Sequence, residues 1–384
     1  MGFNYYMPTR IFFGAGSVKK LAKTRLPGKK ALLITGGSST TKLGYVDLVR
    51  SLLTQAGADS VLYDQVQPNP TIDSVRACAA LAREQGCDFV VGLGGGSSID
   101  TAKATAVAAA NPGDYWDYVY GGTGGGKRME HDPLPIVAIT TTAGTGTEAD
   151  PWMVVTHGEE KIGSGGDKTF PTLSIVDPEL MSTVPPRMTA YQGFDALFHA
   201  VEGYIATIAS PITDMYALRS IELIGKSLPR AVADGMDMDA RADVALANTL
   251  SGFVESMSSC VSEHSIEHAL SAFHPKLTHG AGLIMLSLAY FETLLGVCDE
   301  RFIDMARALG KTDANRAEDF LEALAELQRA CGVDDLRMSE FGITEEKFGD
   351  YADNARATMG ALFKLDRKQL SREDVIDILR RSYR

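Results

Sequence analysis

The 384-residue sequence predicts an α/β domain with a mostly parallel sheet over residues 1–183, followed by an all-helical domain over residues 184–384. Strand-like and helix-like stretches alternate in the first half, and the strands are continuous apolar runs. Such runs are typical of a parallel sheet that helices cover on both faces. A proline-rich break, TVPPRMT (183–189), ends this region, and helical periodicity dominates beyond it.

The predicted elements follow one another in a regular order. In the first half we expect a strand at 31–37, a strand at 60–66, and strands that run into small-residue turns within 88–96 and 136–146, with helices at 46–56 and 71–85. In the second half we expect helices at 189–207, 211–232, 238–258, 261–272 and 280–295, with further helical segments to the end.

Composition excludes several classes of protein. Lys and Arg number 37 against 49 Asp and Glu, so the net charge is 37 − 49 = −12, which argues against nucleic acid or an anionic membrane as partner. No uncharged apolar run reaches the roughly 18 residues of a membrane span. Five dispersed cysteines indicate reduced thiols, so we expect a cytoplasmic protein.

A glycine turn follows the third strand, in GLGGGSSID (92–100). Gly95 and Gly96 let backbone N–H groups approach a ligand, and a helix starting near Ser97, with Asp100 in its first turn, adds free donors that suit a pyrophosphate. The usual G-x-G-x-x-G pattern is not met, because Ser97 replaces the third glycine. A plain tight turn remains the alternative.

Two more small-residue turns follow predicted strands. TTTAGTGTE (140–148) contains Thr141, Thr142 and Thr145, and the first strand ends in GGSST (36–40), with Gly36, Gly37 and Ser38. Ligands of open α/β sheets bind at the carboxyl ends of strands, so these turns predict a cofactor site. The first strand ends in glycine and serine, and Lys42 lies just beyond it, so this end can accept a 2′-phosphate.

Histidines gather in the helical half. Asp195 and His199 are spaced i, i+4, as are His264 and His268, and His279 follows a short loop. Imidazoles with one carboxylate suit Fe²⁺ or Zn²⁺. His264-Ser-Ile-Glu267-His268 also matches H-x-x-E-H, so a zinc peptidase with Glu267 as base is a rival hypothesis.

Together these segments resemble the iron-containing (group III) alcohol dehydrogenases, within the dehydroquinate synthase-like fold. The matching segments are PNP (68–70), GGGSSIDTAK (94–103), TTAGTGTE (141–148), IVDPEL (175–180), GFDALFHAVEGY (193–204) and HSIEHALSAFHPKLTHG (264–280).

The resemblance implies a role for each matched residue. Asp195, His199, His264 and His279 would bind iron, or zinc in its place, although His274 is an alternative to His279. His268 would lie near the nicotinamide and relay a proton. The dinucleotide residues would be Asn69, Gly95, Gly96, Ser97, Thr141, Thr142, Thr145, Lys161 and Leu180. The turns described above add Gly36, Gly37, Ser38 and Asp100 as cofactor candidates.

The resemblance also implies the reaction: hydride transfer between NAD(P) and a small primary alcohol or aldehyde in a homodimer or higher oligomer. Tyr191-Gln192-Gly193 departs from the family pattern before the aspartate. Gly36 stands where NAD-preferring relatives often have Asp, so we expect NADP, with NAD as the alternative. A metal-dependent lyase or cyclase on the same fold is the second hypothesis.

Overall fold

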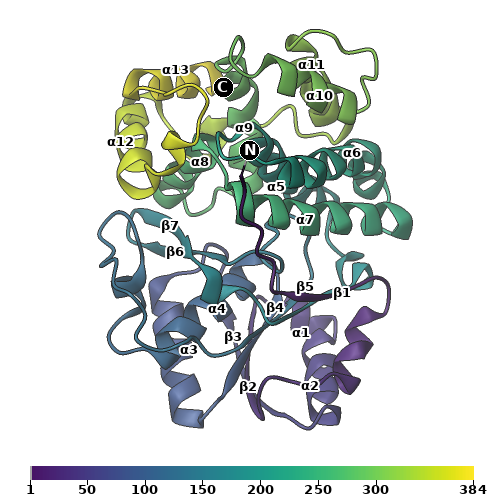
Figure 1. Cartoon of the computed structure of the whole chain (residues 1–384), viewed down its shortest axis with the longest axis vertical. Coiled ribbons are helices and arrows are strands. Elements are labelled where there is room, and N and C mark those ends of the chain that lie inside the picture. The colour runs from purple at the N-terminus through teal and green to yellow at the C-terminus, as the bar shows by residue number, and fades with distance from the viewer. Residues whose placement is uncertain (1) are drawn as a thin grey trace.

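A six-stranded, fully parallel sheet forms the core of the first half of the chain in the computed structural model, which describes residues 2–384 (Figure 1). The strand order is β1-β8-β5-β4-β2-β3. The strands are β1 (Arg10–Phe13), β2 (Lys30–Gly36), β3 (Asp59–Val66), β4 (Phe89–Gly94), β5 (Ile136–Thr140) and β8 (Leu173–Val176). The predicted fold class is confirmed, whereas β1 and β8 were not among the predicted strands.

Helices cover both faces of this sheet: α1 (Ser39–Lys42), α2 (Tyr45–Gln55), α3 (Ile72–Gln85) and α4 (Gly96–Ala110). Successive strand residues point to opposite faces. Leu33 of β2 therefore belongs to the same core as Val49 of α2, whereas Leu32 belongs to the core that contains Ala82 of α3. Burial on both faces explains why the central strands β4 and β5 are apolar along their length, whereas the edge strand β3 carries exposed polar residues.

The glycines of β4 bring α4 directly onto the strand. A Cβ added at Gly92 would lie 2.8 Å from Ile99 Cα, and Gly94 has φ +143, which side chains rarely adopt. Helix α4 therefore begins immediately beyond the strand, at Gly96, slightly before the expected start near Ser97.

The second half consists of helices, as expected (Figure 1). Pro186 occupies the first turn of α5, where a missing N–H costs nothing.

The domain boundary at residue 184 stays a prediction, although the last sheet strand ends before it. None of the helices within residues 2–384 combines the length and apolarity needed to cross a bilayer. The helices are α5 (Pro186–Ile205), α6 (Pro211–Ala233), α7 (Met238–Ser258), α8 (Ser262–Phe273), α9 (His279–Glu292), α10 (Asp299–Ala308), α11 (Glu318–Ala330), α12 (Phe348–Met359) and α13 (Arg372–Ser382).

A separate antiparallel hairpin links the two halves. Its strands are β6 (Trp152–His157) and β7 (Glu160–Gly165), and Gly158 forms the turn with φ +62. The hairpin packs against α4 on one side and against α8 and α12 on the other. This hairpin was not among the predicted elements. Lys161 of β7 reaches the helical half, where its Nζ contacts Ser271 and Glu267 of α8.

Candidate active site

Helix α5 presents a row of polar side chains from an otherwise apolar, buried helix. Asp195, His199 and Glu202 are spaced four and three residues apart, so they share one face. All three are buried. The turn after β5 approaches this face closely, since a Cβ added at Gly144 would lie 3.1 Å from Asp195 Oδ2. The small residue at this position leaves room for the carboxylate.

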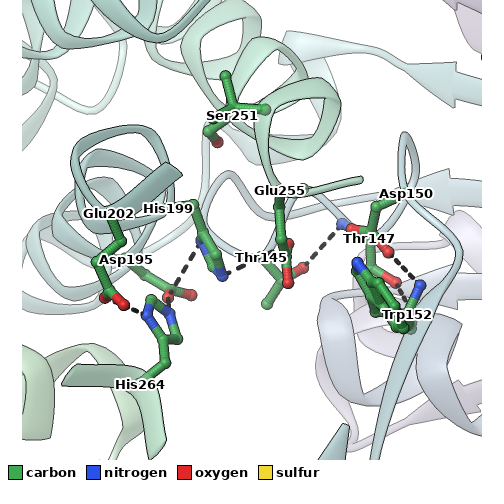
Figure 2. A network of polar contacts seen from close by, with 12 residues as sticks. Thr145, Thr147, Asp150, Trp152, Asp195, His199, Glu202, Ser251, Glu255 and His264 are labelled. Atoms are coloured by element: carbon green, nitrogen blue, oxygen red, sulfur yellow. Dashed lines mark hydrogen bonds and ion pairs between the residues drawn. The ribbon is translucent and has the colours of Figure 1, made fainter. Parts of the chain in front are cut away.

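The predicted metal ligands converge on the Asp195 carboxylate. Its Oδ1 lies 3.6 Å from His199 Nδ1, 3.7 Å from His264 Nε2 of α8 and 3.4 Å from His279 Nε2 of α9. Figure 2 shows Asp195 between His199 and His264. Three helices distant along the chain thus bring one carboxylate and three imidazoles together.

Three of these atoms have no hydrogen-bond partner within the described residues: Asp195 Oδ1, His199 Nδ1 and His264 Nε2. Buried polar atoms normally have partners. Unpaired lone pairs aimed at a common space are what a divalent cation would satisfy, and nitrogen and oxygen donors suit Fe²⁺ or Zn²⁺. The donor set therefore fits the metal that the sequence analysis predicts.

The protonation states also favour cation binding. Burial alone would raise the pKa of Asp195, but His199, His279 and His264 lower it to about 2. Burial lowers the pKa of His199 to about 4 and that of His279 well below its usual range. At neutral pH the ionised Asp195 carboxylate and the neutral His199 and His279 imidazoles are in the forms that bind metals. Burial lowers the pKa of His264, but Cys260, Glu202 and Asp195 raise it well above its usual value, so a bound cation would replace a proton on this ring.

Two buried glutamates hold the outer nitrogens of these histidines. Glu202 Oε1 contacts His264 Nδ1, and Glu267 Oε2 contacts His279 Nδ1. A carboxylate on one ring nitrogen places the proton there and leaves the other nitrogen as the ligand. Lys161 Nζ lies 3.5 Å from Glu267 Oε2. Glu267 therefore has partners that the zinc peptidase hypothesis would not give its base.

His268 lies beside the four proposed ligands but is not one of them. Its ring centroid is 5.2 Å from that of His279, and its Nδ1 has no partner in the described chain. Burial, with Lys161 and His279 nearby, lowers the pKa of His268 well below the usual histidine value of 6.5. His274, the alternative ligand, lies elsewhere: its Nε2 is 2.7 Å from the Tyr351 hydroxyl.

The small-residue turns pack against one another at the carboxyl ends of the strands. A Cβ added at Gly95 would lie 3.0 Å from Thr142 Oγ1, and one at Gly96 would lie 2.5 Å from Thr145 Cγ2. The turn after β4 and the turn after β5 therefore form one surface. Bare backbone at the start of α4 suits a phosphate group.

A cavity of about 700 Å³ lies between the halves of the molecule. This volume is within the usual range for small-molecule sites. The helical half contributes His199, His264, His268 and His279 to its lining, and Asp195 lies behind them. From the sheet half and the hairpin it is lined by Asn69, Gly96, Ser97, Asp100, Thr145 and Lys161.

Other predicted cofactor residues lie outside this lining. Gly36 ends β2 and is followed by Gly37 and Ser38, whereas Gly95, Thr141 and Thr142 lie in the turns just described. Leu180 is buried in the sheet-side core beside Leu173. Gly36 has a structural role of its own, because an added Cβ would lie 2.4 Å from the Val66 carbonyl oxygen. Packing alone explains the glycine there.

Both carboxylate oxygens of Asp100 accept hydrogen bonds from other residues of the protein. Its Oδ1 accepts a 2.7 Å hydrogen bond from Thr147 Oγ1, and its Oδ2 accepts one of 2.9 Å from Val154 N. The carboxylate that sequence assigns to the cofactor ties α4 to the hairpin. Its predicted cofactor role stays a prediction.

Comparison with known proteins places the chain in a family. The family described as iron-containing alcohol dehydrogenase matches residues 8–178, and its C-terminal domain matches residues 189–383. An NAD-dependent methanol dehydrogenase from Bacillus methanolicus is 35% identical over 364 residues, covering 92% of this chain and 93% of the relative. A choline dehydrogenase from Bacillus subtilis is 37% identical over 310 residues, covering 80% and 76%.

Solved structures agree with this result. An archaeal halo-thermophilic alcohol dehydrogenase from a Red Sea brine pool has a TM-score of 0.95 and 35% identity, covering 100% of this chain and 99% of that one. The chain belongs to the iron-containing alcohol dehydrogenase family and is an oxidoreductase. The sequence-based family assignment is confirmed.

Proposed function

We propose that the chain transfers hydride reversibly between a nicotinamide dinucleotide and a small primary alcohol or its aldehyde. The proposed ligands of an iron ion, or of zinc in its place, are Asp195, His199, His264 and His279. The observation that carries the proposal is the convergence of unpartnered buried donors beside a cavity whose opposite wall carries the phosphate-type turn.

The chain's own residues prepare this reaction. When bound, the metal supplies Lewis acidity that favours negative charge on the substrate oxygen, and the nicotinamide supplies the hydride chemistry. Glu202 and Glu267 hold the ligand tautomers. His268 lines the cavity and is placed to relay a proton. Gly96 and Ser97 at the start of α4 would hold the pyrophosphate.

We propose NADP as the preferred dinucleotide, with NAD the alternative. No acidic side chain ends β2, and Ser38, Ser39 and Lys42 are exposed just beyond it. Acidic residues at this place usually bind the ribose hydroxyl of NAD. Kinetics with NADPH and NADH would decide between them.

Exposed apolar residues support our proposal for the oligomeric state, and the free cysteines support our proposal for the cellular location. We propose a homodimer or larger oligomer, because β1 is an edge strand and the segment around it exposes Phe3, Tyr5, Tyr6 and Phe13. The five cysteines are buried free thiols, in keeping with the cytoplasmic location we propose.

Two matched substitutions test the ligand set. His279→Ala should abolish bound iron and alcohol oxidation together, because it removes a donor beside Asp195. His274→Ala should retain both, since His274 contacts Tyr351 instead. Metal analysis of anaerobically purified protein and dinucleotide-linked kinetics provide the measurements. Iron loss in the His274 variant with retention in the His279 variant would reverse the assignment.

A further inference from the structure

The β6–β7 hairpin turns one of its two faces toward the cavity. Side chains alternate between the faces of a strand, and the register pairs Trp152 with Gly165 and Val154 with Gly163. Trp152, Val154, Lys161 and Gly163 line the cavity, whereas the alternate residues pack in the core beneath α3 and α4: Met153, Val155 and Ile162. The hairpin therefore gives the cavity a floor with a charged end at Lys161 and an apolar end at Trp152.

The end of α12 covers the apolar part of this floor from the helical half. Met359, the last residue of α12, and Leu362 both line the cavity. A Cβ added at Gly163 would lie 3.5 Å from Met359 Cε and 3.8 Å from Val154 Cγ2, so the methionine side chain reaches the hairpin. We call the part of the cavity lined by Trp152, Val154, Met359 and Leu362 the apolar slot.

The apolar slot adjoins the proposed metal ligands. Ser265, the residue after His264, donates from Oγ to Met359 O at 3.5 Å. At the charged end of the floor, Lys161 Nζ lies 3.5 Å from His279 Nδ1. The next residue on this face of β7 lies about 7 Å further along the strand, a length that a chain of about five carbons also spans. An alcohol of that length with its hydroxyl at the ligands would therefore reach the slot.

The charged side chains of the cavity lining have partners of their own. These contacts are Lys161 Nζ with Ser271 Oγ at 2.8 Å, Arg356 with Leu370 O, Asp100 Oδ1 with Thr147 Oγ1 at 2.7 Å, Asp150 Oδ1 with Lys103 Nζ at 3.1 Å, and Glu255 Oε2 with His199 Nε2 at 3.6 Å. The apolar slot itself is formed by hydrocarbon, thioether and indole groups. A polar end group placed there would lose its hydrogen bonds to water.

We infer that the substrate is an unbranched primary alcohol, or its aldehyde, whose alkyl chain of about five carbons lies in the apolar slot. This inference rests on the proposed function, because the hydroxyl must lie at the Asp195–His279 cluster. An alkyl chain gains from burial in such a slot at each methylene group. The slot is narrow, since a single methyl group at Gly163 would already touch Met359.

A series of alcohols tests the chain-length preference. For iron-loaded wild type we expect kcat/KM to rise by about fourfold for each methylene from ethanol to 1-pentanol. The alcohol 1,4-butanediol has as many non-hydrogen atoms as 1-pentanol, but a hydroxyl replaces the terminal methyl. Its kcat/KM should be lower than that of 1-pentanol by about tenfold or more.

Two matched glycine substitutions test where the chain lies. Gly163→Val adds methyl groups against Met359 and narrows the slot, so the 1-pentanol-to-ethanol ratio of kcat/KM should fall toward unity. Gly166→Val should keep the wild-type ratio, because a Cβ added at Gly166 meets no atom within 4 Å. Metal analysis of each variant accompanies the kinetics.

A methionine pair tests the slot in the opposite direction. Wild type should prefer 1-pentanol to its branched isomer 3-methyl-1-butanol. Met359→Ala widens the slot and should reduce this preference. Met236→Ala, at a side chain that is 68% exposed, should retain it.

Fluorescence tests the slot independently of turnover. The chain has two tryptophans, Trp116 and Trp152, and bromine quenches indole emission on contact. We expect 5-bromo-1-pentanol to quench wild-type emission saturably. Trp152→Phe retains only Trp116, which packs in the core beneath α3 and α4, and should lose the saturable component.

The outcomes separate the two proposals. Equal kcat/KM for ethanol and 1-pentanol would overturn the alkyl inference and leave the proposed function intact. No turnover of any alcohol or aldehyde by iron-loaded protein would overturn the proposed function, while the quenching still decides whether the slot binds an alkyl alcohol. Undiminished saturable quenching in Trp152→Phe would show that the chain lies elsewhere.

Discussion

At the scale of single residues, the candidate site depends on acids that sequence did not single out. Asp195, His199, His264 and His279 were predicted from helical spacing and from the family resemblance. Glu202 and Glu255 were not, because acids are common on helices and nothing local separates a buried one from a solvated one. Glu267 was noticed only as the base of a rival motif. The missing information was tertiary, namely which histidine each acid faces.

Glu202 gives a prediction at this scale. Glu202→Gln should weaken iron binding by about 10- to 100-fold, because the amide no longer fixes the proton on His264 Nδ1. Competition with a chelator measures the affinity. Glu148→Gln, a buried glutamate that contacts α7 and no proposed ligand, should bind iron as the wild type does. Equal affinities for all three proteins would show that the Glu202 contact does not tune the metal site.

At the scale of elements, the parallel strands and the long helices were predictable because their periodicity is strong and uninterrupted. The hairpin β6–β7 was not, since its short strands alternate weakly and are interrupted by glycines. The same limit explains Asp100. Its place in the first turn of α4 indicated a ligand, but the unpredicted hairpin supplies Val154 N as its partner.

Glu148, in the loop between β5 and the hairpin, should make the stability of the protein depend on pH. Burial raises the pKa of Glu148 from 4.5 to about 7, while one oxygen accepts hydrogen bonds from Asn248 and Thr249. A raised pKa gives stability that is fully present below the unfolded value and lost as pH rises through 7. The shift of 7 − 4.5 = 2.5 corresponds to about 3 kcal/mol of stability lost.

Urea unfolding at about pH 5 and about pH 8 checks this effect. The unfolding free energy of wild type should fall relative to Glu148→Gln by about 3 kcal/mol over that range, since the amide does not titrate. Parallel pH profiles of the two proteins would contradict the assignment to Glu148.

At the scale of the whole molecule, a few polar contacts join the sheet half to the helical half. Lys161 Nζ on the hairpin lies 2.8 Å from Ser271 Oγ and 3.5 Å from Glu267 Oε2 of α8. Asn69 Nδ2, at the end of the sheet, donates to Pro275 O at 3.3 Å. Sequence predicted both residues only as cofactor contacts. These contacts depend on how the two halves are positioned relative to each other, and no local sequence pattern predicts that arrangement.

The Lys161–Glu267 pair gives a prediction for the assembled molecule. Lys161→Met should lower the unfolding free energy by about 3 kcal/mol, because the buried Glu267 carboxylate loses the Lys161 ammonium and keeps only its contact with His279. The double variant Lys161→Met/Glu267→Gln should lose less than the sum of the two single variants. Urea unfolding of the four proteins measures this coupling, and strict additivity would show that the pair contributes nothing across the halves.

The proposed ligands all come from α5, α8 and α9, whereas the phosphate-type turns belong to the sheet. The dinucleotide turns are therefore expected to keep their shape whether or not the metal is bound. A preparation stripped of its ion by oxygen or chelation would still retain the nucleotide pocket. Such inactive enzyme would be restored by simple remetallation rather than by refolding.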